Sequence, residues 1–274
     1  MKKVLLAFDG QHFSTSAFEF VKQMNNSQPI MLIGLFLPSI DFVELLYSFG
    51  AVPAGPMYVS RVHEVDHEVL EKNIAHFKEL CIENNIRFSV HKDFDQHIVT
   101  KVKEETRFAD LLVLSSTTFY SNLGTETQED YITNVLHKAE CPVVLIPGEY
   151  NAPKNIILAY DGSEQSVYAI KQFAYLFPEF RSTHALLVYF NTTEKGVPDH
   201  RYIEELAALY FEHFSIFKLK IGPKKDLEQW IHDYGNTLLV AGAYGRSAFS
   251  EMFKKSFISE VIHDHEIPLF VAHK

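Results

Sequence analysis

The sequence has few cysteines, a single tryptophan and no long hydrophobic run. Among its 274 residues, the two cysteines, Cys81 and Cys141, form no C-x-x-C pair. A disulfide framework or a thiolate zinc site is therefore not expected. The apolar run after Met1 stops at Asp9, too early for a signal peptide. No stretch approaches the roughly 18 apolar residues that a transmembrane helix needs. We therefore expect a cytoplasmic protein that does not bind a membrane.

Basic residues are also fewer than acidic ones. The chain has 25 Lys and Arg against 35 Asp and Glu, giving a formal net charge of −10. Proteins that bind nucleic acids need uncompensated positive charge against phosphate, so no nucleic-acid partner is expected. A local basic site can still hold a small anion. Hydrophobic residues make up 47% and charged residues 22%, which are ordinary globular proportions.

The chain contains an internal repeat. Lys3–Gly10 reads KVLLAFDG, and Asn155–Gly162 reads NIILAYDG 152 positions later. Two further pairs of segments follow in the same order, at offsets of 127 and 126: Leu111–Ser115 with Leu238–Gly242, and Cys141–Ile146 with Ile267–Ala272. The falling offset makes the second copy about 25 residues shorter in its middle. Three blocks in one order predict two tandem domains.

Residues 147–154 separate the two copies. This stretch contains two prolines and a glycine, which break regular structure and favour a short linker. We therefore place the first domain at residues 1–147 and the second at residues 154–274.

Short apolar runs alternate with longer stretches of helical spacing in both copies. The runs lie at 3–8, 30–36, 111–115, 143–146, 155–160, 183–190, 215–219, 237–241 and 268–272. They lack polar alternation, as is typical of strands covered on both faces. The second-copy helices are expected near 164–176, 199–213, 223–234 and 249–263. This alternation predicts an α/β fold of two Rossmann-like domains, each with a parallel sheet and helices on both faces. Ligands bind such sheets at the carboxyl ends of strands, here after the first and fourth strands of each copy.

The second copy has two glycines directly after its fourth strand. The sequence there reads Gly242-Ala-Tyr-Gly245-Arg246-Ser247 and precedes a helix. Glycines at this place permit a positive φ and let a phosphate approach backbone N–H groups. A tight turn that needs glycine only for its geometry is an equally good interpretation.

Together these features resemble the universal stress protein family. The resemblance covers essentially the whole chain as two fused copies and is clearest in Asn155–Ser163 and Leu238–Ser247. It implies that each copy has a five-stranded parallel sheet of the adenine nucleotide alpha hydrolase-like type. It also implies a non-enzymatic binding or regulatory role in stress response. Nucleotide-binding members carry G-x2-G-x9-G-[S/T], with the first-strand Asp near adenine and ribose and the glycine loop on the phosphates.

The resemblance assigns an ATP site to the second copy alone. Its residues would be Asp161, Gly162, Ser163, Gly242, Gly245, Arg246, Ser247, Lys255 and Ser256. Lys255 stands where the family motif has glycine. Its charge could favour a phosphate, and its side chain could equally block the backbone approach that glycine permits. ATP binding and a nucleotide-free role through protein contacts or another small ligand therefore remain alternatives, and no cofactor is obligatory.

The first copy departs further from the family motif. Ser115 and Thr118 replace the two glycines, and Glu129 or Asp130 aligns near Ser256. Carboxylates at that place would repel a triphosphate. We therefore expect that the first copy does not bind ATP.

Two histidine-rich segments are candidate metal sites. His63-Glu64-Val65-Asp66-His67 satisfies H-E-x-x-H, which would suit a zinc hydrolase, although a solvated helix explains it better. His263-Asp264-His265 lies between a helix and the last strand, where a turn is the simpler interpretation. We expect no metal site. The Gly50–Pro56 segment, rich in glycine and proline, is either a lid over a pocket or a surface excursion, and we favour the second.

No catalytic constellation emerges from the sequence. G-x-S-x-G, the P-loop pattern and the H-x-G-H signature of nucleotidyl-transfer relatives are all absent. Neither Asp9 nor Asp161 is assigned a nearby histidine or second carboxylate as an acid–base partner. We expect no catalytic residues and no enzymatic turnover.

The resemblance also bears on assembly, because family dimers pair their fifth strands. Val143–Ile146 and Leu269–Ala272 could pair within one chain and cover two strand edges. We therefore predict an intramolecular pseudo-dimer of the two domains, with further homodimerisation left open.

Overall fold

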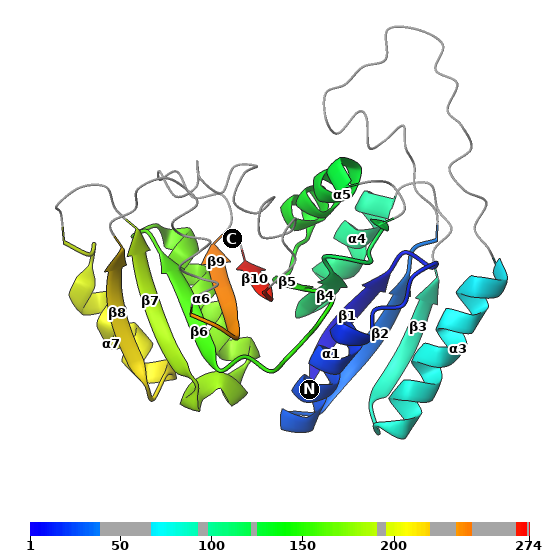
Figure 1. Ribbon diagram of the computed structural model, residues 1–274, viewed down its shortest axis with the longest axis horizontal. Coiled ribbons are helices and arrows are strands. Elements are labelled where there is room, and N and C mark those ends of the chain that lie inside the picture. The colour runs from blue at the N-terminus through cyan, green and yellow to red at the C-terminus, as the bar shows by residue number, and fades with distance from the viewer. Residues whose placement is uncertain are drawn as a thin grey trace, which may run out of the picture. The chain divides into compact units, whose positions relative to one another are not determined.

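The computed structural model describes residues 1–38, 67–92, 98–121, 125–190, 196–219, 234–242, 267–272 and 274. The chain divides into two compact units, Met1–Cys141 and Pro142–Lys274, which are described separately (Figure 1). The candidate segments Gly50–Pro56, His63–Asp66 and His263–His265 lie outside the described residues.

The first unit has a parallel sheet with the strand order β3-β2-β1-β4. Its strands are β1 (Lys2–Phe8), β2 (Ile30–Phe36), β3 (Arg87–Lys92) and β4 (Leu111–Ser115). Its helices are α1 (Thr15–Ser27), α3 (His67–Glu83), α4 (Ile98–Arg107) and α5 (Thr125–Lys138). Helix α1 contacts β1 and β4, α3 contacts β2 and β3, and α4 packs against α5. The strand order reverses at β1, which places a topological switch point between β1 and β4.

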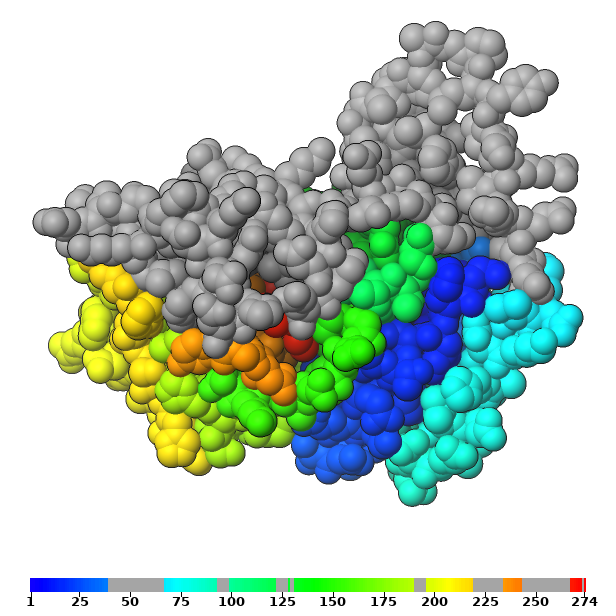
Figure 2. All heavy atoms as spheres, viewed as in Figure 1, coloured from blue at the N-terminus to red at the C-terminus, as the bar shows by residue number. Residues whose placement is uncertain are grey.

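Phe77 of α3 is the centre of the first unit's aromatic core. Its ring meets those of Phe8, Phe18, Phe36 and Phe88 at centroid distances of 5.8–6.5 Å. A Cβ at Gly34 of β2 would lie 2.7 Å from the Phe77 ring, so glycine lets the helix approach the sheet. Figure 2 shows the outside of this unit, where the cyan residues of α3 and β3 lie beside the blue N-terminal elements.

The second unit contains the expected five-stranded parallel sheet, in the order β10-β9-β6-β7-β8. Its strands are β6 (Asn155–Tyr160), β7 (His184–Phe190), β8 (Phe214–Leu219), β9 (Thr237–Gly242) and β10 (Leu269–Ala272). Its described helices are α6 (Glu164–Leu176), the short 3-10 helix η2 (Pro178–Ser182) and α7 (His200–Tyr210). Helix α6 packs on β9 and β10. The α/β, Rossmann-like fold class predicted from the sequence is confirmed.

Strand β5 (Val143–Ile146) runs antiparallel to β10, with Val144 opposite Phe270. These are the two segments that the sequence marked as able to pair. The second unit begins at Pro142, ahead of the linker at residues 147–154, and therefore includes β5.

Candidate functional site

The first strand of each copy lies between two parallel neighbours and ends in Asp-Gly. Gly10 follows β1 with φ +86°, and Gly162 follows β6 with φ +81°. A Cβ at Gly10 would lie 3.0 Å from Cβ of Pro38, and one at Gly162 would lie 2.8 Å from Cβ of Pro198. Each glycine therefore meets a left-handed backbone and a close proline from the segment after the next strand. The two copies share this geometry at the carboxyl edge of the sheet.

In the second unit, Asp161 is half-buried at the end of β6. Its Oδ1 accepts a hydrogen bond of 2.8 Å from the backbone N–H of Ser163. Ser163 is the N-cap of α6, and its Oγ accepts from the N–H of Ser166 at 3.2 Å. A carboxylate acceptor and the positive end of a helix dipole thus lie within a few residues of one another.

Gly242 ends the neighbouring strand β9 beside the first turn of α6. A Cβ there would lie 2.5 Å from the carbonyl carbon of Gln165 and 2.6 Å from its oxygen. Because those are backbone atoms, this position requires glycine for close packing, whether or not a ligand binds. Of the nine predicted site residues, the structure gathers Asp161, Gly162, Ser163 and Gly242 at one edge. The others lie outside the described residues: Gly245, Arg246, Ser247, Lys255 and Ser256.

Asp199 supplies a second carboxylate near the same edge, and its charge acts on Tyr160. The hydroxyl of Tyr160 donates to the carbonyl oxygen of Pro198 at 3.0 Å. Burial, together with the charges of Asp199 and Asp161, raises the pKa of Tyr160 to about 12. The described part of this edge therefore offers carboxylate acceptors, which suit hydroxyl and amino donors.

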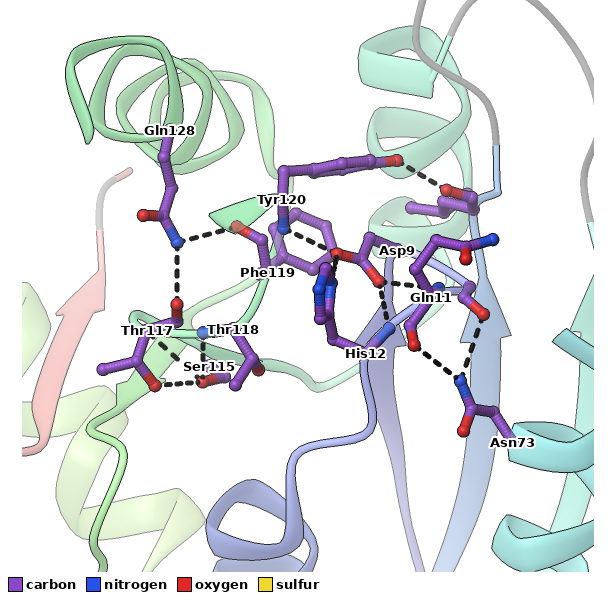
Figure 3. A network of polar contacts seen from close by, with 12 residues as sticks. Asp9, Gln11, His12, Asn73, Ser115, Thr117, Thr118, Phe119, Tyr120 and Gln128 are labelled. Atoms are coloured by element: carbon purple, nitrogen blue, oxygen red, sulfur yellow. Dashed lines mark hydrogen bonds and ion pairs between the residues drawn. The ribbon is translucent and has the colours of Figure 1, made fainter. Parts of the chain in front are cut away.

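In the first unit, the corresponding Asp9 has very different surroundings. Its side chain is buried, and four donors from its own chain reach it (Figure 3). Oδ1 accepts from the N–H groups of Gln11 (2.9 Å) and His12 (2.8 Å). Oδ2 accepts from Nδ1 of His12 at 2.6 Å and from the N–H of Tyr120 at 2.8 Å. The carboxylate is thereby engaged by its own unit.

His12 corrects the sequence analysis, which assigned Asp9 no histidine partner. His12 lies only three positions after Asp9, and the turn at Gly10 brings its imidazole back onto the carboxylate. The hydrogen bond to Asp9 raises the pKa of His12. A histidine three positions after Asp9, beyond the turn at Gly10, is the feature of the sequence that indicates this pairing.

The first copy has three residues between its Asp-Gly turn and the next helix that the second copy lacks. Gln11, His12 and Phe13 separate Gly10 from Ser14, the N-cap of α1. In the second copy, the N-cap Ser163 directly follows Gly162. From α3, Nδ2 of Asn73 donates to the carbonyls of Gly10 and Gln11, each at 3.1 Å. Phe13 stacks on Phe8 at a centroid distance of 5.0 Å. The first copy therefore inserts a short segment that folds over its own aspartate.

The loop after β4 is held by side chains. Oγ of Ser115 accepts from the N–H groups of Thr117 (3.3 Å) and Thr118 (3.1 Å). From α5, Nε2 of Gln128 donates to the carbonyl of Phe119 at 2.9 Å. The side chains of Glu129 and Asp130, which the sequence analysis used against ATP, lie outside the described ones.

The remaining candidates gain no support as sites. His67 is the exposed first residue of α3, and its proposed partners His63 and Glu64 lie outside the described residues. Across the described ranges, no group of three metal-binding side chains gathers. In the same part of the chain, no helix has the length and apolar character to cross a membrane.

Two α/β units, each with an Asp-Gly turn after its central parallel strand, define the fold class of this protein. Neither a protein-family model nor a curated protein matches the sequence. A universal stress protein from Archaeoglobus fulgidus has a similar structure, with a TM-score of 0.65 and 15% identity, covering 100% of this chain and 96% of that one. A functionally unknown protein from Pseudomonas aeruginosa matches with a TM-score of 0.52 and 14% identity, covering 100% of this chain and 92% of that one. The chain therefore has the fold of a universal stress protein.

Proposed function

We propose that this protein is a universal stress protein that acts as a regulatory binding module without catalytic turnover. Its second unit binds ATP or a related nucleotide, and its first unit does not. The observation that carries this proposal is the half-buried carboxylate of Asp161 at the switch point, beside the start of α6.

The contrast between the two copies supports the assignment. Asp9 is 3% exposed and receives four hydrogen bonds from its own chain, whereas the Asp161 side chain is only half-buried. A partly accessible carboxylate can accept from a ribose hydroxyl or an adenine amino group. The N-terminus of α6 favours negative charge nearby. Lys255, which stands where the family motif has glycine, would add positive charge for the phosphates.

A nucleotide-free module is the second candidate. It is favoured by the acidic groups at this edge, because Asp199 faces Tyr160 and Glu164 lies exposed in the first turn of α6. Carboxylates repel a triphosphate, so they favour a neutral or cationic small ligand, or a protein contact.

The two candidates differ in what the purified protein retains. We expect mass spectrometry of small molecules released by denaturation to find stoichiometric ATP or ADP. Protein that stays empty, even after incubation with millimolar ATP and Mg²⁺, would assign the nucleotide-free role.

Asp161→Asn is the sharpest variant for the proposed site. If the carboxylate accepts from ribose or adenine, the substitution should weaken ATP binding about tenfold or more, measured by isothermal titration calorimetry. If the carboxylate only repels phosphates, the same substitution should strengthen binding.

Asp110→Asn is the matched control, because Asp110 lies on the surface before β4 and accepts from the N–H of Lys3 at 2.7 Å. It makes the same charge change away from the carboxyl ends of the strands and should leave ATP affinity unchanged. Gly242 is unsuitable for this test because its substitution would disturb the packing of α6.

A further inference from the structure

Tyr120 lies where sheets of this kind bind their ligands. It belongs to the loop after β4, and its backbone N–H donates to Asp9 at the end of β1. Its hydroxyl donates to the carbonyl oxygen of Leu37, directly after β2, at 2.6 Å. Because the strand order is β2-β1-β4, this residue crosses the carboxyl end of the central strand. In open α/β sheets that crevice holds the ligand.

The Tyr120 ring is enclosed much as a bound ring would be. Only 3% of the residue is exposed. Phe119 and Tyr131 meet it edge-on, at centroid distances of 4.6 and 4.7 Å. Figure 3 shows the ring extending from the loop past Asp9 toward its carbonyl acceptor. The surroundings thus combine aromatic walls with one backbone acceptor at the far end.

The backbone at Tyr120 is held in an unfavourable conformation. Its φ is +56°, in the left-handed region that a bulky side chain rarely adopts. Such a conformation persists where the surroundings over-determine it, and it is common at ligand clamps and switches. Three hydrogen bonds restrain the loop here. Tyr120 donates to Asp9 and to the carbonyl of Leu37, and Gln128 donates to the carbonyl of Phe119.

We propose that Tyr120 is an internal ligand occupying a ring-binding site in the first unit. The site accepts a planar aromatic ring with a hydroxyl donor at its far end, and this chain fills it with its own phenol. A free ligand of this class enters only when the Tyr120 ring is absent or displaced. This inference is independent of nucleotide binding by the second unit.

The test removes the ring and supplies it again from solution. Tyr120→Gly deletes the side chain, and glycine adopts the positive φ without strain. In the full-length protein, 4-methylphenol at ten times its dissociation constant should raise the melting temperature of this variant by about 5 °C. Toluene, which has the same shape without the hydroxyl, should bind at least fivefold more weakly. The unsubstituted protein should bind neither compound.

Two further variants separate this site from a generic cavity. Tyr120→Phe keeps the ring and should continue to exclude 4-methylphenol. Phe77→Ala removes a buried ring of the same unit that carries no hydroxyl, and it should show no preference for 4-methylphenol over toluene. The same preference in Phe77→Ala would overturn the proposal, because Leu37 would then not select the hydroxyl.

The proposal does not depend on the stability of Tyr120→Gly. If the variant is unfolded alone, 4-methylphenol should increase its folded fraction on dilution from denaturant, measured by circular dichroism. No effect of 4-methylphenol on either melting or refolding would overturn the proposal.

Discussion

Asp9 and Asp161 have the same place in their copies, but Asp9 is buried and Asp161 is half-buried. The difference comes from neighbours that the repeat does not share. Gln11 and His12 fold onto Asp9 from the inserted segment, and Tyr120 reaches it from the loop after β4. The repeated Asp-Gly therefore identifies a position in the fold, and its neighbours decide how far the carboxylate is buried.

His12 makes the state of the Asp9 network depend on pH. Since the hydrogen bond to Asp9 raises the pKa of His12 above 6.5, proton binding stabilises the folded state. That stabilisation is complete below pH 6.5 and is lost as the pH rises through the folded-state pKa. NMR should show the His12 imidazole titrating at higher pH in the folded than in the urea-unfolded chain.

The variant His12→Gln assigns the His12 imidazole signal in the NMR spectrum, because that signal disappears. It also tests the effect on stability: the variant should have a lower free energy of unfolding than the unsubstituted protein, and the difference should be larger at pH 5.5 than at pH 8.5. An equal or reversed difference would show that the ion pair does not contribute to stability.

Sequence patterns predicted the buried strands well, because nearly every residue in those strands is apolar. Strand β3 was missed. It reads RFSVHK, lies at the sheet edge, and has partly exposed side chains that give no continuous apolar run. At the candidate site, the repeat located Asp161 and Gly242. Tyr120 could not be predicted, since its partners lie 83 and 111 positions away and depend on the folded loop.

The contact between β9 and α6 gives a prediction about elements. Gly242→Ala places a Cβ 2.5 Å from backbone atoms of α6, so strand and helix must separate. We expect a loss of about 1–3 kcal/mol in unfolding free energy. Urea unfolding followed by circular dichroism measures this loss.

Gly196→Ala is the matched control in the same unit, because nothing lies within 4 Å of the added Cβ. It should change the free energy of unfolding by less than about 0.5 kcal/mol. Equal effects of the two substitutions would show that close packing is not what position 242 requires.

At the scale of the whole molecule, the repeat and the contacts divide the chain at different points. By sequence, β5 completes the first copy, and the linker follows at residues 147–154. By contacts, β5 belongs with the second unit through β10. A chain pairing strands from the two copies in this way needs no partner chain to cover the β10 edge.

This division can be tested with two buried valines. Val144 of β5 and Val113 of β4 are both 0% exposed. Replacing either with alanine should cost about 2 kcal/mol, from lost burial and a small cavity. Because Val144 pairs with Phe270, Val144→Ala should lower the hydrogen-exchange protection of the backbone amides in β6 and β7. Val113→Ala should lower the protection of the amides in β1 and β2 and leave that of β6 and β7 in place. If Val113→Ala shifts both equally, the two units unfold as one.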